Sequence, residues 1–334
     1  MDPDRPVAPS RRTRAAVAVG IGLALLLAAC DSTGPALGAS PSATATTDVG
    51  GTESPEPSPT PTVTPLSREE YIVELGRAAG RVRAAFDLVK RARSYNGLGV
   101  RLVRARTSVG RATDALAALT PPEDAAAVHD EFIDALRGYA AVLVNLAGDV
   151  DTREVCGAPS AMARLGQAGA GRRLRAATRG LARAGYRLGG AIAPPPKPLP
   201  GRSLRTGTFI ISGVRTGRGT LTIRNRQQLD GVVTLTANRS QAPAISVYVT
   251  GRSKYTVRGV RDGRYTAYTT QGADWDRDLG TFTRRCTFLR FASPLTYTTS
   301  FTSSAIRYTT WTLTLGGSRG GGGTDAIDPD DFPG

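Results

Sequence analysis

The stretch GADWDRDLG, residues 272–280, holds the sharpest group of side chains that could do chemistry. Asp274, Asp276 and Asp278 alternate along it, and alternating oxygen ligands are how calcium-binding loops begin. An EF-hand loop would need glycine at its sixth position and glutamate at its twelfth, whereas leucine and arginine stand there. The pattern favours a tight acidic turn, in which carboxylates accept from backbone N–H groups or pair with arginines, over a calcium site.

Two of these aspartates could instead act as the acid and base of a wall-polysaccharide hydrolase, because glycosidases use paired carboxylates. Nothing else in the sequence resembles a sugar-cleaving cleft. His129 is the only histidine, so no histidine cluster can hold a metal, and a Ser-His-Asp triad would have to use this residue. It lies beside the apolar stripe of a predicted helix, at the margin of a core. We therefore expect a protein that is not an enzyme and needs no cofactor. The alternatives are the hydrolase and a calcium-stabilised carbohydrate-binding module that uses the turn of Asp274, Asp276 and Asp278.

Cys30 ends an apolar run that follows three arginines near the N-terminus. The run is about 15 residues long, which is short for a helix that spans a bilayer. A basic segment, a short apolar segment and small residues before a cut site are typical of a secretory signal peptide. Leu27-Ala28-Ala29-Cys30 resembles the lipobox of bacterial lipoproteins, in which the cysteine thiol is diacylated and becomes the first residue. The alternative is a conventional signal or anchor with an incidental cysteine.

Cys156 and Cys286 are the two remaining cysteines. In an oxidising exterior, an even pair invites a disulfide. Such a bridge would join the two predicted folded domains. The alternative is that each is a small buried hydrophobic residue, as free cysteine often is.

The net charge of +15 is shared by both predicted domains. Outside the cell, this excess predicts attraction to anionic lipid headgroups or wall polymers. No zinc-ligand spacing, helix-turn-helix signature or RNA-reading motif is present, so nucleic acid is not expected as a partner. The expected partners are the membrane, through the lipid anchor, and an anionic envelope polymer or envelope protein.

Apolar residues recur every three or four positions in four stretches between residues 67 and 192, which predicts helices. Ser67 with Glu70, and Thr120 with Glu123, are spaced as capping boxes. Beyond residue 204 the period changes to two, and eight or nine short strands are expected. The Asp-Gly pairs at 230–231 and 262–263 predict turns, the second a tight hairpin. Trp311 is the most plausible aromatic residue of the β core.

The predicted fold is multidomain α + β, with an antiparallel four-helix bundle followed by an all-β sandwich. A lipid-anchored chain would carry the bundle and the sandwich on a disordered Ser/Thr/Pro-rich stalk. The Gly/Asp-rich tail is expected to be flexible until its last residues, where Phe332 could dock. The predicted segments are a signal peptide (1–29), the lipidated cysteine and stalk (30–66), the helical bundle (67–192), a proline-rich linker (193–203), the β-sandwich (204–316) and the tail (317–334).

The motifs SVYV, YTVRGVRDGRYTAYTTQGADWD, RRCTFLRF, YTTWTLTL and DPDDFPG follow one another through residues 204–334. In this order they resemble a β-rich module of uncharacterised actinobacterial, Streptomyces-like, secreted lipoproteins. The stretch ALTPPEDAAAVHDEF is similar to the helical part of such proteins. The VRGVRDGRY segment is similar to strand pairs in carboxypeptidase-regulatory-like and prealbumin-like sandwiches. The resemblance implies an extracytoplasmic location and this architecture, and no activity.

Overall fold

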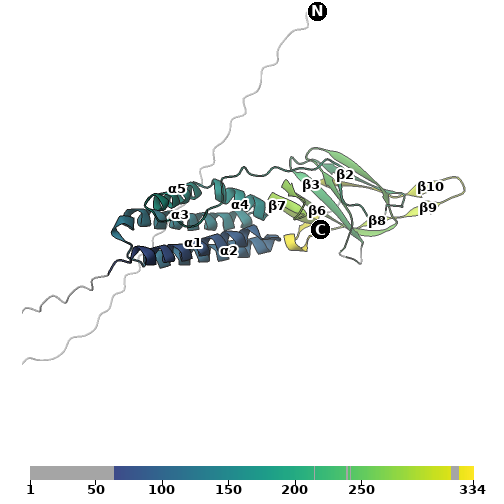
Figure 1. Cartoon of the computed structure of the whole chain (residues 1–334). Coiled ribbons are helices and arrows are strands. Elements are labelled where there is room, and N and C mark those ends of the chain that lie inside the picture. Colours follow the sequence, from purple (N-terminus) through teal and green to yellow (C-terminus); the bar gives the residue numbers. More distant parts are fainter. Residues whose placement is uncertain (1–63, 214, 238–239, 241, 317–322) are drawn as a thin grey trace, which may run out of the picture. The chain divides into compact units, whose positions relative to one another are not determined.

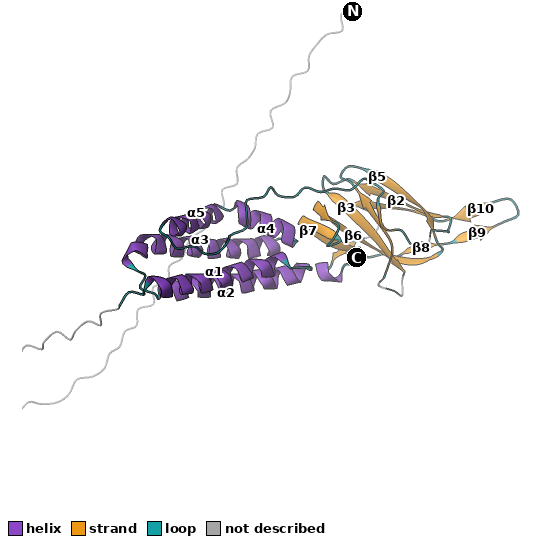
Figure 2. Ribbon diagram, in the orientation of Figure 1, coloured by secondary structure: helices purple, strands orange, loops and turns teal. Residues whose placement is uncertain are grey.

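The computed structural model describes residues 64–213, 215–237, 240, 242–316 and 323–334. These residues lie in one compact unit, Pro61–Gly334. Within it, five α-helices precede a mostly antiparallel β region, so the chain is α + β (Figures 1 and 2). The helices are α1 (Arg68–Lys90), α2 (Tyr95–Ala117), α3 (Ala126–Asp151), α4 (Ala158–Gln167) and α5 (Gly169–Arg183), with 3-10 turns η1 (Glu123–Ala125) and η2 (Pro329–Asp331).

The start of α1 agrees with the capping box predicted from the sequence, whereas the start of α3 does not. Ser67 and Glu70 form the predicted capping box, because each side chain accepts from the other's backbone N–H. The predicted box at Thr120 does not form. Pro122 leads instead into η1, and α3 then starts after Ala125 without any side-chain cap.

The fourth predicted helix is two helices, α4 and α5. Ala168 separates them with an extended backbone, at a ψ of 142°. Three of the six residues from Gly166 to Gly171 are glycine, which is a poor helix former. The last helix then ends at Arg183, so the predicted stripe residue Leu188 is buried in the segment that follows it.

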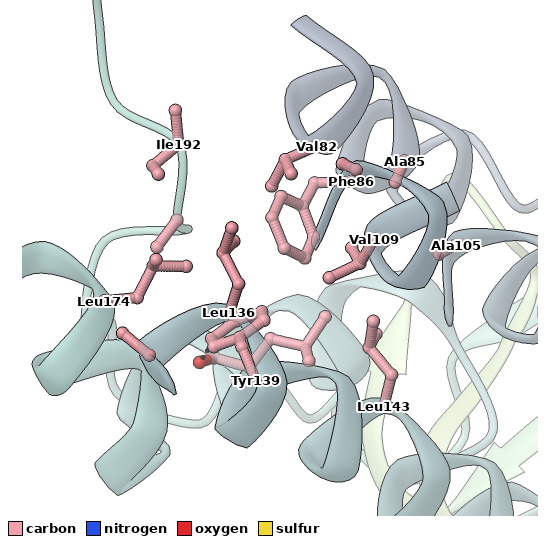
Figure 3. Packing of buried hydrophobic residues seen from close by; sticks show 14 of the residues in the cluster. Val82, Ala85, Phe86, Ala105, Val109, Leu136, Tyr139, Leu143, Leu174 and Ile192 are labelled. Atoms are coloured by element: carbon pink, nitrogen blue, oxygen red, sulfur yellow. Dashed lines mark hydrogen bonds between the residues drawn. The ribbon is translucent and has the colours of Figure 1, made fainter. Parts of the chain in front are cut away.

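The helical core combines many alanine and aliphatic side chains with a few aromatic rings. Phe86 of α1 packs edge to face on Tyr139 of α3, with ring centroids 5.2 Å apart, while Leu136, Leu143 and Val109 surround them (Figure 3). Alanines at many of the remaining buried positions let the helices approach closely. At the start of α1, Tyr71 is buried, whereas its neighbour Ile72 is 40% exposed.

The β region is divided among three sheets in the described residues. The largest has the order β1-β4-β3-β6-β7-β12, with β8 also on β6; a second has the order β11-β2-β5; β9 and β10 form a separate pair. The strands are β1 (Phe209–Ile211), β2 (Gly219–Asn225), β3 (Asp230–Ala237), β4 (Pro243–Val249), β5 (Lys254–Val260), β6 (Gly263–Asp276), β7 (Thr281–Phe291), β8 (Leu295–Tyr297), β9 (Thr299–Phe301), β10 (Ile306–Tyr308), β11 (Thr310–Leu315) and β12 (Thr324–Ala326).

One turn prediction is wrong, and the hairpin predicted at the other is absent. Asp230 and Gly231 begin strand β3 instead of forming a turn. The pair at 262–263 does lie between consecutive strands, but β5 pairs with β2 while β6 pairs with β3, β7 and β8. The connection therefore crosses from one sheet to another and is not a hairpin. Side chains of both sheets share one core, to which β2 contributes Leu221 and β3 contributes Leu235.

The prediction that Trp311 lies in the β core is wrong. Trp311 is 37% exposed, at the start of β11, and its indole N–H donates to the Thr296 carbonyl at 3.0 Å. Trp275 is buried instead, packed against Tyr248 and Phe282. Trp311 lies beyond the end of the core, because Leu313 and Leu315, on the same face of β11, are buried.

The C-terminal residues contact both the helices and the sheet. Phe332 packs edge to face on Phe288, with ring centroids 5.6 Å apart, so its predicted docking is present. Asp330 accepts a hydrogen bond from the Tyr95 N–H at the start of α2, at 3.0 Å. A cavity of about 350 Å³ lies beside these residues, lined in part by Cys156.

Candidate functional site

Cys30, the predicted lipidation site, and the predicted signal peptide lie outside the described residues. Within the described residues, no helix is both long enough and apolar enough to cross a bilayer.

A disulfide joins Cys156, in the loop between α3 and α4, to Cys286 in β7. The two cysteines are 130 residues apart in sequence, and their Cα atoms are 6.4 Å apart. Backbone hydrogen bonds flank the bridge: the Cys156 N–H donates to the Thr283 carbonyl at 2.8 Å, and the Cys286 N–H donates to the Arg153 carbonyl at 3.1 Å. The α3–α4 loop is thus held against β7 by backbone pairing as well as by the covalent bond.

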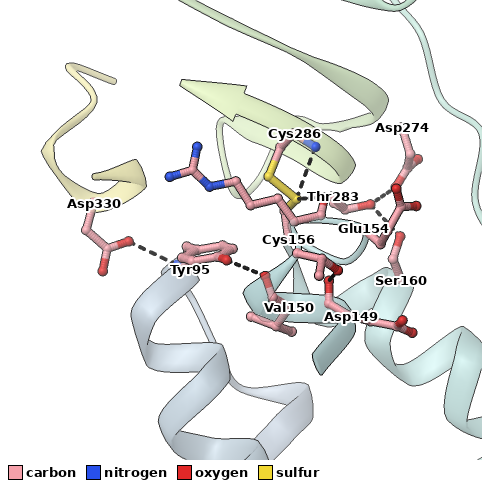
Figure 4. The surroundings of a disulfide bond; sticks show 12 residues. Tyr95, Asp149, Val150, Glu154, Cys156, Ser160, Asp274, Thr283, Cys286 and Asp330 are labelled. Atoms are coloured by element: carbon pink, nitrogen blue, oxygen red, sulfur yellow. Dashed lines mark hydrogen bonds between the residues drawn. A yellow bond between two sulfur atoms is a disulfide. The ribbon is translucent and has the colours of Figure 1, made fainter. Parts of the chain in front are cut away.

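A chain of hydroxyl groups runs from α4 to the predicted acidic turn. Ser160 Oγ lies 2.6 Å from Thr283 Oγ1, and Thr283 Oγ1 donates to the Asp274 carboxylate (Figure 4). All three side chains are buried. This polar network ties the helical part to β6 and β7 next to the disulfide, because buried polar groups need hydrogen-bond partners.

Asp274 is neutralised by Arg202, which follows the proline-rich segment. The guanidinium donates from Nε and Nη2 to the two carboxylate oxygens, each at 2.8 Å, and the Arg202 backbone N–H donates to Oδ1 at 3.0 Å. Burial alone would raise the pKa of the Asp274 carboxyl, but the hydrogen bonds from Arg202 and Thr283 outweigh it and lower that pKa. The buried carboxylate is therefore ionised and fully paired.

Asp276 and Asp278 do not join Asp274 in a metal site. Asp276 Oδ2 lies 2.9 Å from Arg202 Nη1, and its Oδ1 accepts from the backbone N–H groups of Asp278 and Leu279. Asp278 is exposed. No three His, Cys, Asp or Glu side chains in the described residues are grouped so as to hold a metal ion. This arrangement is the acidic turn that the sequence favoured over calcium, and it leaves Asp274 and Asp276 no free carboxylate to serve as acid and base.

His129 is buried and takes part in a polar pair inside the helices. Its Nδ1 lies 2.8 Å from the Tyr71 hydroxyl, and burial lowers the pKa of its imidazole. Tyr186 packs edge to face on Tyr71, with ring centroids 5.1 Å apart. His129 therefore lies deeper in the core than the predicted margin, and its hydrogen-bond partner is a phenol, not a nucleophile.

The most concentrated positive charge on a single element lies on α5. Leu174, Ala177 and Leu181 face the core, which leaves the arginines on the opposite side exposed. None of the exposed arginines forms a salt bridge with a described residue. We call this group the α5 arginine surface; it consists of Arg172, Arg173, Arg179 and Arg183 of α5 and Arg187 just beyond it.

The balance of positive and negative charge differs between the two edges of the α5 arginine surface. Arg173 and Arg183 line a hollow together with Glu131 and Asp134 of α3, which partly offset their charge. Arg179, Arg183 and Arg187 line another hollow, in which the only other lining residue is an alanine. Guanidinium groups are suited to phosphate and carboxylate because their planar fork donates two hydrogen bonds at once. The second hollow is the better candidate for an anionic ligand.

A run without acidic residues marks this surface in the sequence, although the net charge of the whole chain does not reveal it. No Asp or Glu occurs between Val155 and Leu229, although arginines are frequent there. That run predicts unneutralised charge, but only the helical period of α5 places Arg172, Arg179 and Arg183 on one face, with Arg173 on the flank toward α3. Arg202 belongs to the same run, and its role as the partner of Asp274 has no local sequence signal.

Comparisons with protein-family models, curated proteins and solved structures found no match for this chain. The resemblance to actinobacterial lipoproteins and to prealbumin-like sandwiches therefore remains an expectation from the quoted motifs.

Proposed function

We propose that this protein is a lipid-anchored, extracytoplasmic binding protein whose α5 arginine surface holds an anionic polymer of the cell envelope. In this proposal the helices form an antiparallel bundle, the two larger sheets form a sandwich, and Cys30 carries the lipid. The bridge between Cys156 and Cys286 supports an exported protein, because disulfides persist in oxidising compartments.

The α5 arginine surface carries the binding part of the proposal. Its arginines are exposed and form no salt bridge within the described residues, and four of the five lie on one helix. A flexible polyanion can contact such a row several times, and each cation near an anionic surface contributes about 1 kcal/mol at low salt. A binding role agrees with a site that offers charge but no buried nucleophile or metal ligand group.

The test is binding of the purified full chain to isolated cell walls. Changing Arg179, Arg183 and Arg187 to glutamine should weaken binding about 10- to 100-fold, because three cations are lost from the surface. The matched control changes Arg104, Arg106 and Arg111 of α2, which are also exposed, to glutamine and removes the same charge. Equal weakening by both variants would show that only net charge matters, and it would refute binding at the α5 arginine surface.

The hydrolase and the calcium-stabilised carbohydrate-binding module are not favoured by the geometry of the acidic turn. Both would need carboxylates that face a ligand, whereas those of Asp274 and Asp276 face Arg202 and backbone N–H groups.

A further inference from the structure

The hairpin of β9 and β10 stands apart from the two larger sheets. Its strands pair only with each other among the described residues, and Figure 2 shows the hairpin extending beyond the neighbouring strands. Thr302 and Ala305 close its turn with a backbone hydrogen bond of 2.9 Å. At its base, Asp262 accepts from the Thr299 N–H at 2.7 Å and from its hydroxyl at 2.8 Å. Hydrogen bonds therefore hold the hairpin at its turn and at its base, although its faces are uncovered.

One face of this hairpin is apolar. Phe301 lies opposite Ile306, and Thr299 lies opposite Tyr308. Directly opposed residues in an antiparallel pair point to the same side, and so do residues two apart along a strand. Phe301, Ile306 and Tyr308 therefore share one face, with exposed fractions of 70%, 43% and 49%. Phe301 is the most exposed large hydrophobic side chain in the described residues.

The other face and the surrounding sequence are cationic or neutral. Arg307 lies opposite Ser300, so both belong to the second face. No Asp or Glu occurs between residues 279 and 324. The carboxylate at its base, that of Asp262, accepts hydrogen bonds from Thr299. The hairpin thus combines exposed aromatic and aliphatic side chains with positive charge and no free acid.

We propose that the β9–β10 hairpin inserts its apolar face into the surface of an anionic lipid bilayer. Aromatic and aliphatic side chains partition into the headgroup boundary, where Tyr and Trp are enriched. Arg307 complements the negative surface potential of anionic lipids. A two-stranded ribbon with three large apolar side chains is too narrow for a protein interface of standard size, which needs about 800 Å² from each partner. Insertion of a few side chains into a bilayer has no such requirement.

The proposal for the hairpin does not depend on the α5 arginine surface, so either proposal can be refuted without the other. A tryptophan placed at the hairpin reports on it directly. The probe is the full chain with Phe301→Trp and Trp311→Phe, which leaves only buried Trp275 as background. Residues 1–63 contain no tryptophan, so they cannot contribute to the signal. The membranes are phosphatidylcholine vesicles with and without phosphatidylglycerol, carrying brominated acyl chains as quenchers.

With phosphatidylglycerol present, the fluorescence of the tryptophan at 301 should shift to the blue and be quenched. The matched control places tryptophan on α2, as Val103→Trp with Trp311→Phe, at a side chain that is 58% exposed. Its emission should not change. In a Cys30→Ala background, which removes the proposed lipid anchor, Phe301→Ser with Ile306→Ser should weaken vesicle binding at least about tenfold, because two apolar side chains no longer leave water. The same pair should leave cell-wall binding unchanged.

Three results would overturn the proposal. Equal quenching at positions 301 and 103 would show that the whole chain is adsorbed by other means. Equal quenching with and without phosphatidylglycerol would remove the role of anionic lipid. A concentration-dependent dimer in sedimentation, lost in the Phe301→Ser and Ile306→Ser variant and accompanied by no quenching, would assign the face to a second copy of this chain.

Discussion

Arg202 and Asp274 form a salt bridge with two parallel hydrogen bonds, in which the carboxylate is buried while the guanidinium is 46% exposed. The pair fixes the end of the proline-rich segment to the last part of β6, because the Trp275 N–H also donates to the Arg202 carbonyl at 2.9 Å. The asymmetry in burial predicts unequal effects when either partner is removed.

Arg202→Leu should lower the free energy of unfolding by about 2–3 kcal/mol, since it leaves an ionised carboxylate buried and unpaired. Asp274→Asn should cost about 1–2 kcal/mol, because water can solvate the half-exposed guanidinium. Urea unfolding of both variants tests which substitution lowers the free energy of unfolding more. Arg205→Leu, at an exposed neighbouring arginine, is the control and should be nearly neutral. A larger loss for Asp274→Asn than for Arg202→Leu would contradict this account of the pair.

Acid should weaken the same pair. The folded protein lowers the pKa of the Asp274 carboxyl below its unfolded value, so the stability it contributes is present above about pH 4 and is lost as the pH falls through the folded pKa. Urea unfolding from about pH 5 to about pH 2 should therefore show a shallower loss in Asp274→Asn than in the wild type. Parallel curves would show that Asp274 does not ionise differently on folding.

His129 should give a separate pH dependence at higher pH. Its folded pKa is lowered by burial, so its neutral form favours folding above about pH 6.5, and this stability is lost as the pH falls below that value. Asp130 opposes the shift, and the hydroxyl of Tyr71 contacts the ring. Between about pH 8 and about pH 5, the wild type should lose stability while His129→Gln should not. Because His129 is the only histidine, its imidazole signal in NMR also gives the pKa directly. A value above 6.5 would refute the prediction.

The disulfide should stabilise the protein by about 2–4 kcal/mol, because it closes a long loop in the unfolded chain. Cys156→Ala with Cys286→Ala should move the urea midpoint down by the corresponding amount. Cys30→Ala is the control, since it leaves the bridge intact. Peptide mapping without reductant should recover Cys156 linked to Cys286. Free thiols at both positions in material secreted by the host would contradict the structure.

Local signals predicted the helices and most strands, while features that depend on distant residues were missed. The capping box of Ser67 needs only four residues, and it formed as expected. Strand β7 escaped notice because Phe282 and Thr283 are buried consecutively and Arg285 has a φ of 48°, which interrupts the alternation of period two. The change of sheet between β5 and β6 is set by pairing with β2 and β3, which no turn sequence encodes.

The candidate sites divide in the same way. The pairing of Cys156 with Cys286 could be anticipated because few alternatives exist, whereas the role of Asp274 depends on Arg202, which lies 72 residues earlier. Trp311 was misplaced because alternation identifies the inward side of a strand and does not show where the core ends. The α5 arginine surface needed both an acid-free run and the helical period to be located.

Salt dependence of binding to a fluorescent glycerol-phosphate oligomer tests the central claim most directly. For a polyanion, the slope of log Kd against log salt concentration counts the cations that displace counterions. The full chain with Arg179→Gln, Arg183→Gln and Arg187→Gln should show a slope lower by about 2, and the Arg104, Arg106 and Arg111 control should keep the wild-type slope. Equal slopes for the two variants would contradict binding at the α5 arginine surface.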